Sequence, residues 1–346
     1  MKALIGMSGG VDSSVAAWLT MENGDECVGA TMRLFAENTQ DTADAEQVAR
    51  RLEIDFHVLD LSEDFRRRVM EPFAACYEAG LTPNPCIECN RHLKFGAFLE
   101  KARQMGCDCV VTGHYARIDY NENTGRYQLR KALDETKDQT YFLYTLTQQQ
   151  LRCTRLPLGE KTKAEVREIA EKQGFLNARK RDSQDICFVP DGDYAAFLRR
   201  FTGKCYPAGN YLDLKGNIVG QHQGAVCYTL GQRKGLSLAM GEPVYVCSKN
   251  MAENTVTVGP NEALMHRSLR AKDCNWISID RPDAPIRVKA KARSRMNEEP
   301  ATVYPEETGT VRVEFDVPQR ALTPGQAVVF YHEDLVIGGG TITEII

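Results

Sequence analysis

A pair of adjacent glycines near the start of the chain, Gly9 and Gly10, separates a short apolar run from a helical pattern. The run Ala3–Met7 is typical of a buried strand, and Val15–Leu19 has the spacing of a helix. Adjacent glycines let the backbone turn through positive φ and let a ligand approach without meeting a Cβ atom. Free N–H groups at such a turn and at the following helix N-terminus point the same way and bind anions. This order of elements predicts a phosphate-binding crevice in an α/β domain.

The polar residues around this turn distinguish it from a Walker-type loop. Ser8, Ser13 and Ser14 add hydroxyl donors, but no Gly-Lys-Ser/Thr follows, so no lysine reaches for a terminal phosphate. The segment SGGVDS instead resembles the pyrophosphate loop (PP-loop), SGGxDS, of enzymes that split ATP between its α and β phosphates. Asp12 is unusual beside a phosphate unless a metal ion or a proton needs it. The alternative, a plain glycine-rich turn or cap, is disfavoured because turn, strand, helix and polar residues all agree.

Apolar strands and amphipathic helices alternate along the first third of the chain. The pattern gives strands at 27–32, 56–60 and 109–113 and helices at 42–52 and 95–105. Such alternation predicts a parallel sheet covered by helices. Ligands of these sheets bind beyond the carboxyl ends of the strands, where Ser8, Met32 and Gly113 fall. We therefore expect one nucleotide site at that edge.

The pattern changes twice in the rest of the chain. It is helical from about 140 to 200, and afterwards it consists of period-two strands punctuated by Gly and Pro. Short strands of this kind suggest small antiparallel sheets or barrels. We expect an adenine nucleotide hydrolase-like α/β domain and then two small, mainly β domains, the last one barrel-like. The expected boundaries are 1–202, with a helical part at about 140–202, then 203–265 and 266–346.

Length and composition narrow the class of protein. The 346 residues are enough for two or three domains, and no apolar run approaches the ~20 residues of a membrane span. The first strand follows Met1 and Lys2 directly, which leaves no room for a signal peptide. Twelve cysteines are then expected to be thiols in a reducing cytosol rather than a disulfide framework. We expect a cytoplasmic monomer without a membrane partner.

The net charge of −4 argues against a general nucleic-acid binder but leaves room for a local basic surface. One candidate is Arg179-Lys180-Arg181. Another is an alternating run that would place five cations on one face of a strand: Arg287, Lys289, Lys291, Arg293 and Arg295. For either cluster alone, a solvated face balanced by acids elsewhere explains the charges equally well.

Two cysteine-containing segments stand out. The first, TPNPCIECNRHLKF at 82–95, has two prolines that force an extended loop before a helix. Cys89 is expected near the start of that helix, where the helix N-terminus with Arg91 and Lys94 would lower its pKa and favour thiolate. The second, SQDICF at 183–188, is a polar turn that enters an apolar strand at Cys187.

A Cys-x-x-Cys pair with one distant cysteine leaves four interpretations open. A structural zinc site needs a fourth ligand, for which His92 is a weak candidate. A redox dithiol is a second option, although the start of the fold is not thioredoxin-like. An iron–sulfur cluster held by Cys86, Cys89 and Cys187, with one iron left open, agrees with the count. Reactive thiols that serve sulfur transfer agree equally well.

Several longer motifs occur in a fixed order, and together they carry a family resemblance. Besides SGGVDS and the two cysteine segments they are TGHYAR (112–117), KDQTYFL (137–143), YTLGQRKGL (228–236) and ALTPGQAVVFY (321–331). With them the chain resembles the MnmA family of tRNA-specific 2-thiouridylases over essentially its whole length. The resemblance implies a cytoplasmic tRNA-processing sulfurtransferase in which the helical part at 140–202 helps to bind tRNA.

The chemistry implied by the resemblance has two stages. ATP, with Mg²⁺, adenylates the C2 oxygen of wobble uridine 34 in tRNAs with Lys, Glu or Gln anticodons. A cysteine persulfide then replaces the adenylated oxygen and gives 2-thiouridine, AMP and pyrophosphate. A uracil carbonyl is a poor electrophile, so adenylation makes its oxygen a leaving group for the thiolate-type nucleophile. The sulfur would come from a persulfide donor protein or from free sulfide.

The resemblance also assigns roles by position. Cys187 matches the cysteine that receives the persulfide sulfur, and Cys89 matches the nucleophile that forms a disulfide with it to release that sulfur. Positions that match nucleotide-binding residues are Gly6, Met7, Ser8, Gly9, Gly10, Val11, Asp12, Ser13, Met32 and Gly113. Positions that match the target-base loop and other tRNA contacts are Asn84, Pro85, Cys86, His114, Lys137, Asp138, Gln139, Arg293, Ser294 and Gln326.

One position departs from the family pattern. Many members carry aspartate where this chain has Cys86, and that aspartate is proposed to act on the target base as acid or base. The thiol completes a set of three cysteines of the kind that cluster-dependent tRNA thiolases use. An oxygen-sensitive [4Fe–4S] cluster on Cys86, Cys89 and Cys187 is therefore one hypothesis.

Two other function classes use parts of the same pattern. Another adenylating ligase or amidotransferase with the same loop would not need Cys89 or Cys187. A non-catalytic RNA-binding protein with a vestigial nucleotide fold would not need Asp12 or the serines.

Overall fold

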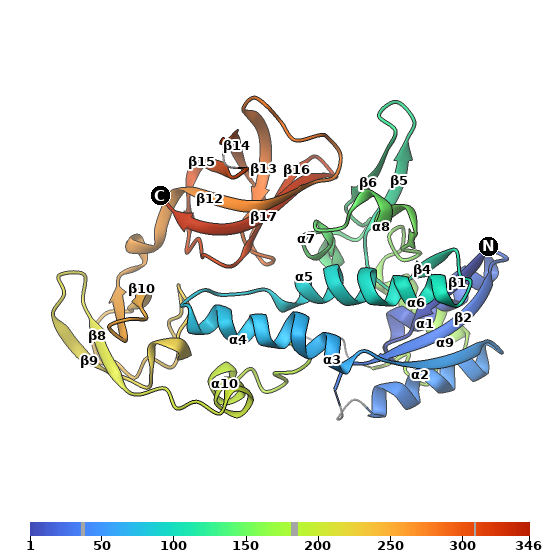
Figure 1. Cartoon of the computed structure of the whole chain (residues 1–346), viewed down its shortest axis with the longest axis horizontal. Coiled ribbons are helices and arrows are strands. Elements are labelled where there is room, and N and C mark those ends of the chain that lie inside the picture. The colour runs from blue at the N-terminus through green and yellow to red at the C-terminus, as the bar shows by residue number, and fades with distance from the viewer. Residues whose placement is uncertain (36–38, 181–185, 308) are drawn as a thin grey trace.

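A five-stranded parallel sheet forms the centre of the N-terminal part of the computed structural model, which describes residues 1–35, 39–180, 186–307 and 309–346 (Figure 1). Its strands are β1 (Lys2–Gly6), β2 (Glu26–Arg33), β3 (Asp55–Asp60), β4 (Cys109–Val111) and β7 (Thr154–Arg155). They lie in the order β3-β2-β1-β4-β7. The direction of winding therefore reverses between β1 and β4, and sheets of this type bind ligands at such a crevice.

Helices cover both faces of this sheet. On one face lie α1 (Val11–Glu22), α2 (Thr39–Arg51) and α9 (Lys163–Lys172), which pack on Ala3 and Ile5 of β1. On the other face, Leu4 and Val110 meet a long helical segment made of α5 (Pro85–Cys89), η2 (Asn90–Ala97) and α6 (Phe98–Gln104). Adjacent residues of one strand thus enter different cores, as a sheet buried on both faces requires.

The parallel sheet and its flanking helices confirm the α/β fold predicted for this part of the chain. Two local predictions differ from the structure. The helix predicted at 95–105 begins ten residues earlier, at Pro85, because proline is favourable in the first turn of a helix. Strand β7, which has only two residues, was not predicted.

The remaining helices are short and follow in several parts of the chain. They are α3 (Ser62–Phe65), η1 (Arg66–Met70), α4 (Glu71–Glu78), η3 (Glu135–Lys137), α7 (Thr140–Leu143), α8 (Gln148–Arg152) and α10 (Tyr194–Thr202). The segments α3, η1 and α4 follow one another without a break and pack beside the helix that carries Cys86 and Cys89 (Figure 1). Within the described residues, no helix is long and apolar enough to cross a membrane.

A small β sheet follows in the order β10-β11-β8-β9. Its strands are β8 (Gly209–Leu212), β9 (Ile218–His222), β10 (Tyr245–Asn250) and β11 (Thr255–Gly259), with short helices η4 (Ala225–Cys227) and η5 (Asn261–Leu264). Tyr211, Val246 and Val256 are fully buried in a core of its own. This confirms the prediction of a small, mainly β unit after the α/β domain.

The C-terminal strands close into a six-stranded barrel, as predicted. They are β12 (Met265–Trp276), β13 (Ile286–Lys291), β14 (Glu299–Pro305), β15 (Val311–Arg320), β16 (Ala327–His332) and β17 (Leu335–Ile345). The order β12-β15-β14-β13-β16-β17 is closed by pairing of β12 with β17. The strand β13 ends at Lys291, so the prediction of five cations on one strand face is wrong: Arg293 and Arg295 lie beyond the strand.

A hairpin from the N-terminal part extends the barrel sheet. Its strands are β5 (Arg117–Asn121) and β6 (Arg126–Arg130), and Arg130 pairs with Leu335 of β17. Asp334 accepts hydrogen bonds from Arg117 and Arg130, each at 2.7 Å. The N-terminal part therefore contributes two strands to the sheet that forms the barrel.

Candidate active site

The turn between β1 and α1 forms a tight, internally bonded loop. The Ser8 N–H donates to Ser13 Oγ at 3.1 Å, and Ser13 Oγ donates to the Gly10 carbonyl at 3.0 Å. Gly9 has φ of +71°, and a Cβ atom there would collide with the carbonyl oxygen of Asp41. Only glycine therefore fits this position, and the first N–H groups of α1 stay directed toward the crevice.

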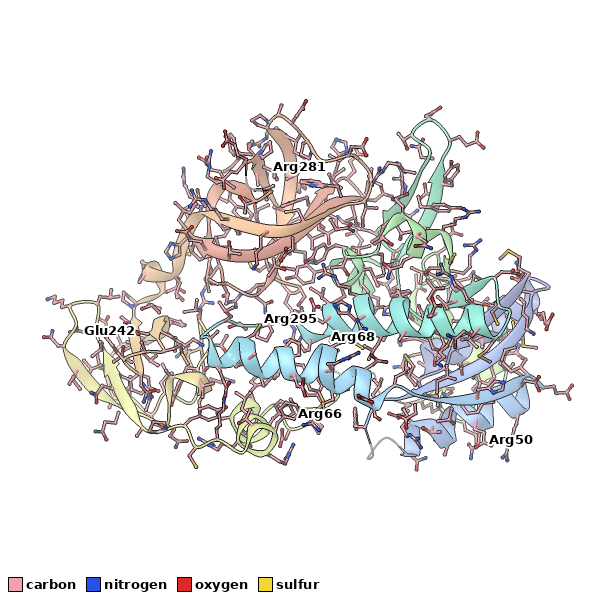
Figure 2. The ribbon with its side chains drawn as sticks, in the orientation of Figure 1. Arg50, Arg66, Arg68, Glu242, Arg281 and Arg295 are labelled. Atoms are coloured by element: carbon pink, nitrogen blue, oxygen red, sulfur yellow. The ribbon has the colours of Figure 1, made fainter. Side chains whose placement is uncertain are left out.

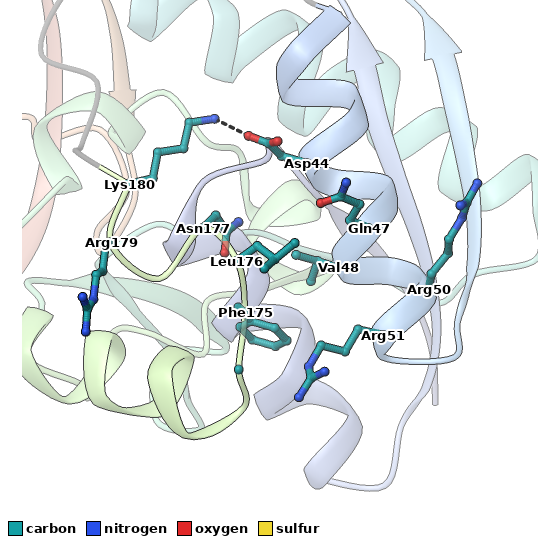
Figure 3. A pocket seen from close by; sticks show the side chains of 11 residues that line it. Asp44, Gln47, Val48, Arg50, Arg51, Phe175, Leu176, Asn177, Arg179 and Lys180 are labelled. Atoms are coloured by element: carbon teal, nitrogen blue, oxygen red, sulfur yellow. Dashed lines mark hydrogen bonds and ion pairs between the residues drawn. The ribbon is translucent and has the colours of Figure 1, made fainter.

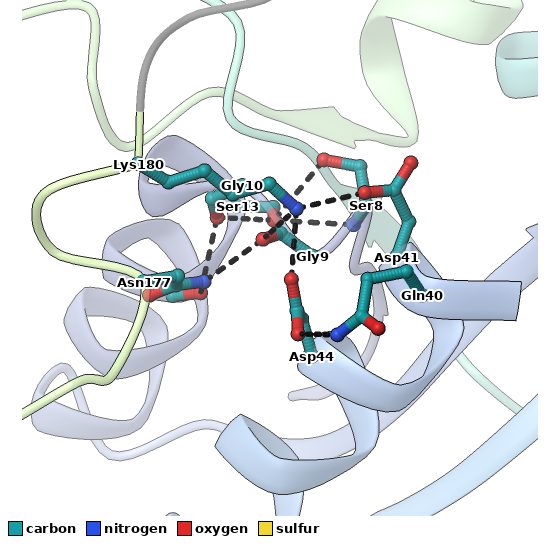
Figure 4. Close-up of polar contacts among 10 residues, drawn as sticks. Ser8, Gly9, Gly10, Ser13, Gln40, Asp41, Asp44, Asn177 and Lys180 are labelled. Atoms are coloured by element: carbon teal, nitrogen blue, oxygen red, sulfur yellow. Dashed lines mark hydrogen bonds and ion pairs between the residues drawn. The ribbon is translucent and has the colours of Figure 1, made fainter. Parts of the chain in front are cut away.

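A second chain segment, with Asn177 and Lys180, lies beside the loop and bonds to it (Figure 4). Asn177 Nδ2 donates to the Gly9 carbonyl at 3.1 Å. Lys180 Nζ forms ion pairs with Asp41 and Asp44, each at 2.8 Å, and these pairs raise the pKa of Lys180 against the effect of its partial burial. Lys180 thus points toward the loop rather than outward, and Arg181 lies outside the described residues.

Asp12 has partners that its sequence context does not reveal. Lys163 Nζ lies 2.7 and 2.9 Å from the two carboxylate oxygens of Asp12, and the Tyr115 hydroxyl donates to the same carboxylate at 2.8 Å. Lys163 is 9% exposed. The carboxylate at the mouth of the loop is therefore neutralised by a buried ammonium group from α9, which no sequence motif marks.

The loop opens into a cavity of about 550 Å³ at the carboxyl ends of β1, β2 and β4. Gly113 lies at the end of β4 and contacts the first turn of α1 so closely that a Cβ atom would lie 2.7 Å from the Ser13 nitrogen. The predicted nucleotide-binding residues that line the cavity are Gly6, Met7, Ser8, Gly10, Val11, Asp12, Ser13, Met32 and Gly113. Gly9 belongs to the same loop.

Three thiols line the same cavity although they come from distant parts of the chain. Cys86 and Cys187 have accessible surface, whereas Cys89 is 8% exposed, and all three are free thiols. Their sulfurs share the cavity wall with Lys94 from η2 and with Pro85. The turn before Cys187, residues 183–185, lies outside the described residues.

The pKa values of these thiols are raised. Burial raises the pKa of Cys89 more than nearby Lys94 lowers it, so the predicted thiolate-favouring environment of Cys89 is wrong. The physical reason is that the helix begins at Pro85, which places Cys89 one turn inside it. For Cys187, removal from water, followed by the proximity of Cys89 and Cys86, raises the pKa to about 12. The thiols are therefore protonated at neutral pH in this state.

The thiols do not form a ready metal site. Among the residues that the structure describes, no group of three or more His, Cys, Asp or Glu side chains is placed to hold a metal ion. The zinc and iron–sulfur interpretations are therefore not supported by the present arrangement of Cys86, Cys89 and Cys187.

His114 and Gln139 complete the wall near the end of β4. His114 is 8% exposed, its Nδ1 lies 2.8 Å from Thr112 Oγ1, and its Nε2 lies 3.4 Å from Lys94 Nζ. Burial, with the charge of Lys94, lowers its pKa well below 6.5, so the imidazole is neutral. Gln139 Oε1 accepts from the Tyr115 N–H at 2.9 Å, and Lys137 also lines the cavity.

Other predicted tRNA contacts have partners within the protein. The carboxylate of Asp138 accepts from the Ala132 N–H and the Thr140 hydroxyl, and burial raises its pKa. The guanidinium of Arg293 donates to Thr323 and to the Leu230 carbonyl, between the barrel and the small β sheet.

Three further predicted contacts lie outside the regular helices and strands and do not line the cavity. Gln326 donates to the backbone of the loop that leads to Cys86. Asn84 is the N-cap residue of α5, and Ser294 is half-buried after β13. Contact of these residues with tRNA stays a prediction.

A second hollow, of about 600 Å³, lies beside α2 (Figure 3). Its lining includes the buried side chains of Val48 and Phe175, the exposed Leu176, and the cations Arg51 and Arg179. It shares Lys180 with the first cavity, but none of the predicted site residues lines it. The cavity with the glycine loop and the thiols is therefore the candidate active site.

Comparisons with known proteins agree over the whole chain. Family models match in three consecutive parts: a tRNA methyl transferase HUP domain at 1–191, a tRNA methyl transferase PRC-barrel domain at 195–260 and an aminomethyltransferase beta-barrel domain at 266–342. A protein of Clostridioides difficile named tRNA-specific 2-thiouridylase MnmA is 47% identical over 352 residues, with 99% of this chain and 98% of that protein covered. Proteins of the same name from Acetivibrio thermocellus and Moorella thermoacetica are 47% and 48% identical over 354 residues, with 99% of both partners covered in each case. The chain therefore belongs to the family of tRNA-specific 2-thiouridylases.

Proposed function

We propose that this protein is a tRNA sulfurtransferase that uses ATP to convert the wobble uridine of tRNA into 2-thiouridine. One observation carries the proposal: the SGGVDS loop and the thiols of Cys86, Cys89 and Cys187 line the same cavity. An adenylating site and a sulfur-transfer site must share one space, because the activated base cannot leave before sulfur attacks it.

The nucleotide would bind at the loop. The N–H groups at the start of α1 are donors for the phosphates of magnesium-bound ATP. The hydroxyls of Ser8 and Ser13, which donate to Ser13 and to the Gly10 carbonyl in the free protein, would turn toward the phosphates. Met32 and Gly113, at neighbouring strand ends, would flank the nucleoside. Lys163 neutralises Asp12, which prevents an unpaired carboxylate from repelling the phosphates.

The thiols would carry out the second stage. The C2 oxygen attacks the α-phosphorus of ATP and pyrophosphate leaves. A persulfide on Cys187 attacks C2, and AMP leaves with that oxygen. Cys89 then attacks Cys187 Sγ, which forms a disulfide between them and leaves the outer sulfur on C2 as the thiocarbonyl. A dithiol reductant restores both thiols, and a persulfide donor protein then transfers its outer sulfur to Cys187. Free sulfide would instead attack the disulfide at Cys187 Sγ, which leaves a persulfide on Cys187 and a thiol on Cys89.

Neutral groups surround the place where the base would sit. Burial raises the pKa of Cys86, so this thiol donates a weak hydrogen bond and carries no charge. The imidazole of His114 is also neutral and can exchange a proton at Nε2. Because the three cysteines are not arranged as ligands, no step is assigned to an iron–sulfur cluster.

The tRNA would approach along the side of the cavity that the helices leave open. Arg66, Arg67 and Arg68 of η1 have side chains that are 68%, 64% and 44% exposed, and η1 packs against α5 (Figure 2). These cations offer phosphate contacts beside the cysteine loop and explain how a chain with a net charge of −4 can hold RNA. Residues 1–202 would carry the chemistry, with 203–265 and 266–346 as the two further domains and a monomer as the working unit.

The decisive experiment combines the purified protein, unmodified tRNA of the Lys, Glu or Gln type, magnesium-ATP and a persulfide donor. Mass spectrometry of the nucleosides should show 2-thiouridine with the wild type and none with Cys187→Ser or Cys89→Ser. Cys205→Ser is the matched control, because Cys205 is an exposed thiol outside the cavity lining. Full thiolation by Cys187→Ser would overturn the assignment.

The same assay separates thiolation from methylation. The matching models for the first two parts carry the words tRNA methyl transferase, whereas the relatives are named for 2-thiouridine formation. Thiols beside a phosphate loop favour thiolation. Incorporation of a methyl group from a methyl donor, without tRNA-dependent release of pyrophosphate, would favour the other reaction.

A further inference from the structure

A turn of the C-terminal barrel contacts the loop that precedes Cys86 and Cys89. The Thr82 N–H donates to the Pro324 carbonyl at 3.0 Å. In return, Gln326 Nε2 donates to the carbonyls of Thr82 and Pro83 at 2.8 and 3.3 Å. Three hydrogen bonds therefore join segments that are more than 240 residues apart in the sequence.

The contact between the two segments is close. Gly325, between the two bonding residues, has φ of +91°, and a Cβ atom there would lie 2.9 Å from the Thr82 nitrogen and 3.0 Å from Leu81 Cβ. Any side chain at Gly325 would therefore push the Thr82 segment away. Glycine is needed at this point both for its backbone conformation and for the approach of the neighbouring chain.

The barrel side of this contact is firmly held. The Gly325 N–H donates to the Ile342 carbonyl at 2.8 Å, and the Ile342 N–H donates to the Gln326 carbonyl at 2.8 Å. The turn is thus bonded on both sides to β17, a strand of the closed barrel. On the cysteine side, residues 82–84 lie in the loop between α4 and α5 and belong to no helix or strand.

We propose that Gly325 and Gln326 form a clamp that positions the loop before α5, and with it Cys86 and Cys89, in the cavity. Asn84 occupies the N-cap position of α5 only two residues after Thr82, so a shift at Thr82 moves the first turn of the helix. Gln326 is then a positioning residue that acts through the backbone of Thr82 and Pro83. The consequence for sulfur transfer rests on the proposed function, whereas the clamp itself does not.

This inference differs from a direct contact of Gln326 with tRNA in a way that can be measured without RNA. A residue that only touches tRNA leaves the tRNA-free protein unchanged when it is replaced. A positioning residue alters the loop in the free protein. The test therefore begins with the full chain in the absence of tRNA and ATP.

Three variants are compared by amide hydrogen exchange at Thr82 and by site-resolved alkylation with iodoacetamide. Gln326→Leu removes two of the hydrogen bonds, and Gly325→Ala introduces the steric conflict. Gly309→Ala is the matched control, because Gly309 in the same barrel has φ of +77° and no atom within 4 Å of its Cβ position. Cys107, which is 6% exposed, is an internal control for global opening of the protein.

We expect Gln326→Leu and Gly325→Ala to speed exchange at Thr82 by tenfold or more and to raise alkylation of the buried Cys89. Gly309→Ala and alkylation of Cys107 should stay unchanged. Wild-type rates at Thr82 and Cys89 in both clamp variants would overturn the proposal. If Gly325→Ala also exposes Cys107, the result with Gln326→Leu decides.

Turnover adds a second readout. Under the proposal, Gln326→Leu lowers kcat for thiolation at least tenfold while the Kd for tRNA changes less than threefold. A loss confined to tRNA affinity, with wild-type exchange at Thr82, would instead make Gln326 an RNA contact. If the protein proved to have another activity, the exchange and alkylation results would still test the clamp.

Discussion

Replacement of Gly113 by alanine tests whether the cavity depends on close packing between β4 and the glycine loop. A Cβ atom at Gly113 would lie 2.7 Å from the Asp12 carbonyl carbon and from the Ser13 nitrogen, both of which are backbone atoms that cannot rotate away. At Gly6, the matching position at the end of β1, the nearest atoms lie at 3.5 Å, which is ordinary van der Waals contact. The two variants make the same chemical change at neighbouring strand ends.

The expected magnitudes follow from this difference. Glycine-to-alanine replacement alone stabilises a compatible position by ~0.4–1 kcal/mol through the unfolded chain. Overpacking of a tight contact destabilises by ~1–3 kcal/mol. Because the first effect is common to both variants, Gly113→Ala should unfold with a free energy about 1–3 kcal/mol lower than Gly6→Ala. Loss of one well-placed donor to a phosphate, worth ~1.5–3 kcal/mol, should also weaken ATP binding roughly 10- to 100-fold.

Urea denaturation gives the free energy of unfolding, and isothermal titration calorimetry with magnesium-ATP gives the affinity. Equal stability and equal ATP affinity of Gly113→Ala and Gly6→Ala would refute the reasoning. Such a result would mean that α1 and the end of β4 can separate without effect on the site.

Three further predictions concern charges near the cavity. Lys163→Met should lower the free energy of unfolding by about 2 kcal/mol, which is less than the loss for a fully buried unpaired charge because the Asp12 side chain is 30% exposed. Lys172→Met, which breaks an exposed pair with Glu168, should change the free energy of unfolding by less than ~1 kcal/mol. Equal urea midpoints of the two variants would contradict this prediction. With a pKa raised to about 12, Cys187 should react with iodoacetamide at pH 7.5 roughly a thousandfold more slowly than a peptide thiol. The rate of its alkylation should still rise beyond pH 9. A plateau of this rate near pH 9 would show that the thiol is not shielded. His114 has a pKa well below 6.5 in the folded state, so the unfolded chain binds more protons below pH 6.5 and the free energy of unfolding falls there by up to ~1.36 kcal/mol per pH unit. In His114→Gln, the slope of the free energy of unfolding against pH should be smaller between pH 6.5 and 5. An unchanged slope would exclude this histidine as its source.

The sequence predicts the elements whose signals are local. The strand ending at Gly6, the turn at Gly9 and the helix that follows are set by neighbouring residues, and all three occur as predicted. The parallel sheet follows from the alternation of such units. Convergence of Cys89 and Cys187 on one cavity could be inferred only through the family resemblance, because no local rule relates two residues so far apart.

Other features depend on contacts that no local pattern encodes. The ion pair between Asp12 and Lys163 spans 151 positions, and the bond between Gln326 and Thr82 spans 244. The raised pKa of Cys89 depends on burial against distant residues, which outweighs the nearby cations that the sequence displays. Strand β7 has two residues and is too short to produce a periodic signal.

The hairpin β5–β6 makes the stability of the N-terminal part depend on the C-terminal barrel. Leu129, Tyr141 and Tyr144 from the first half lie in one hydrophobic core with Val329 and Val336 of the barrel strands. A protein truncated before the barrel would therefore lose Ile277, Ala327, Val329, Tyr331 and Val336 from that core and would leave the edge of β6 unpaired, which favours aggregation. Exchange of the barrel between relatives should succeed only when the hairpin is exchanged with it.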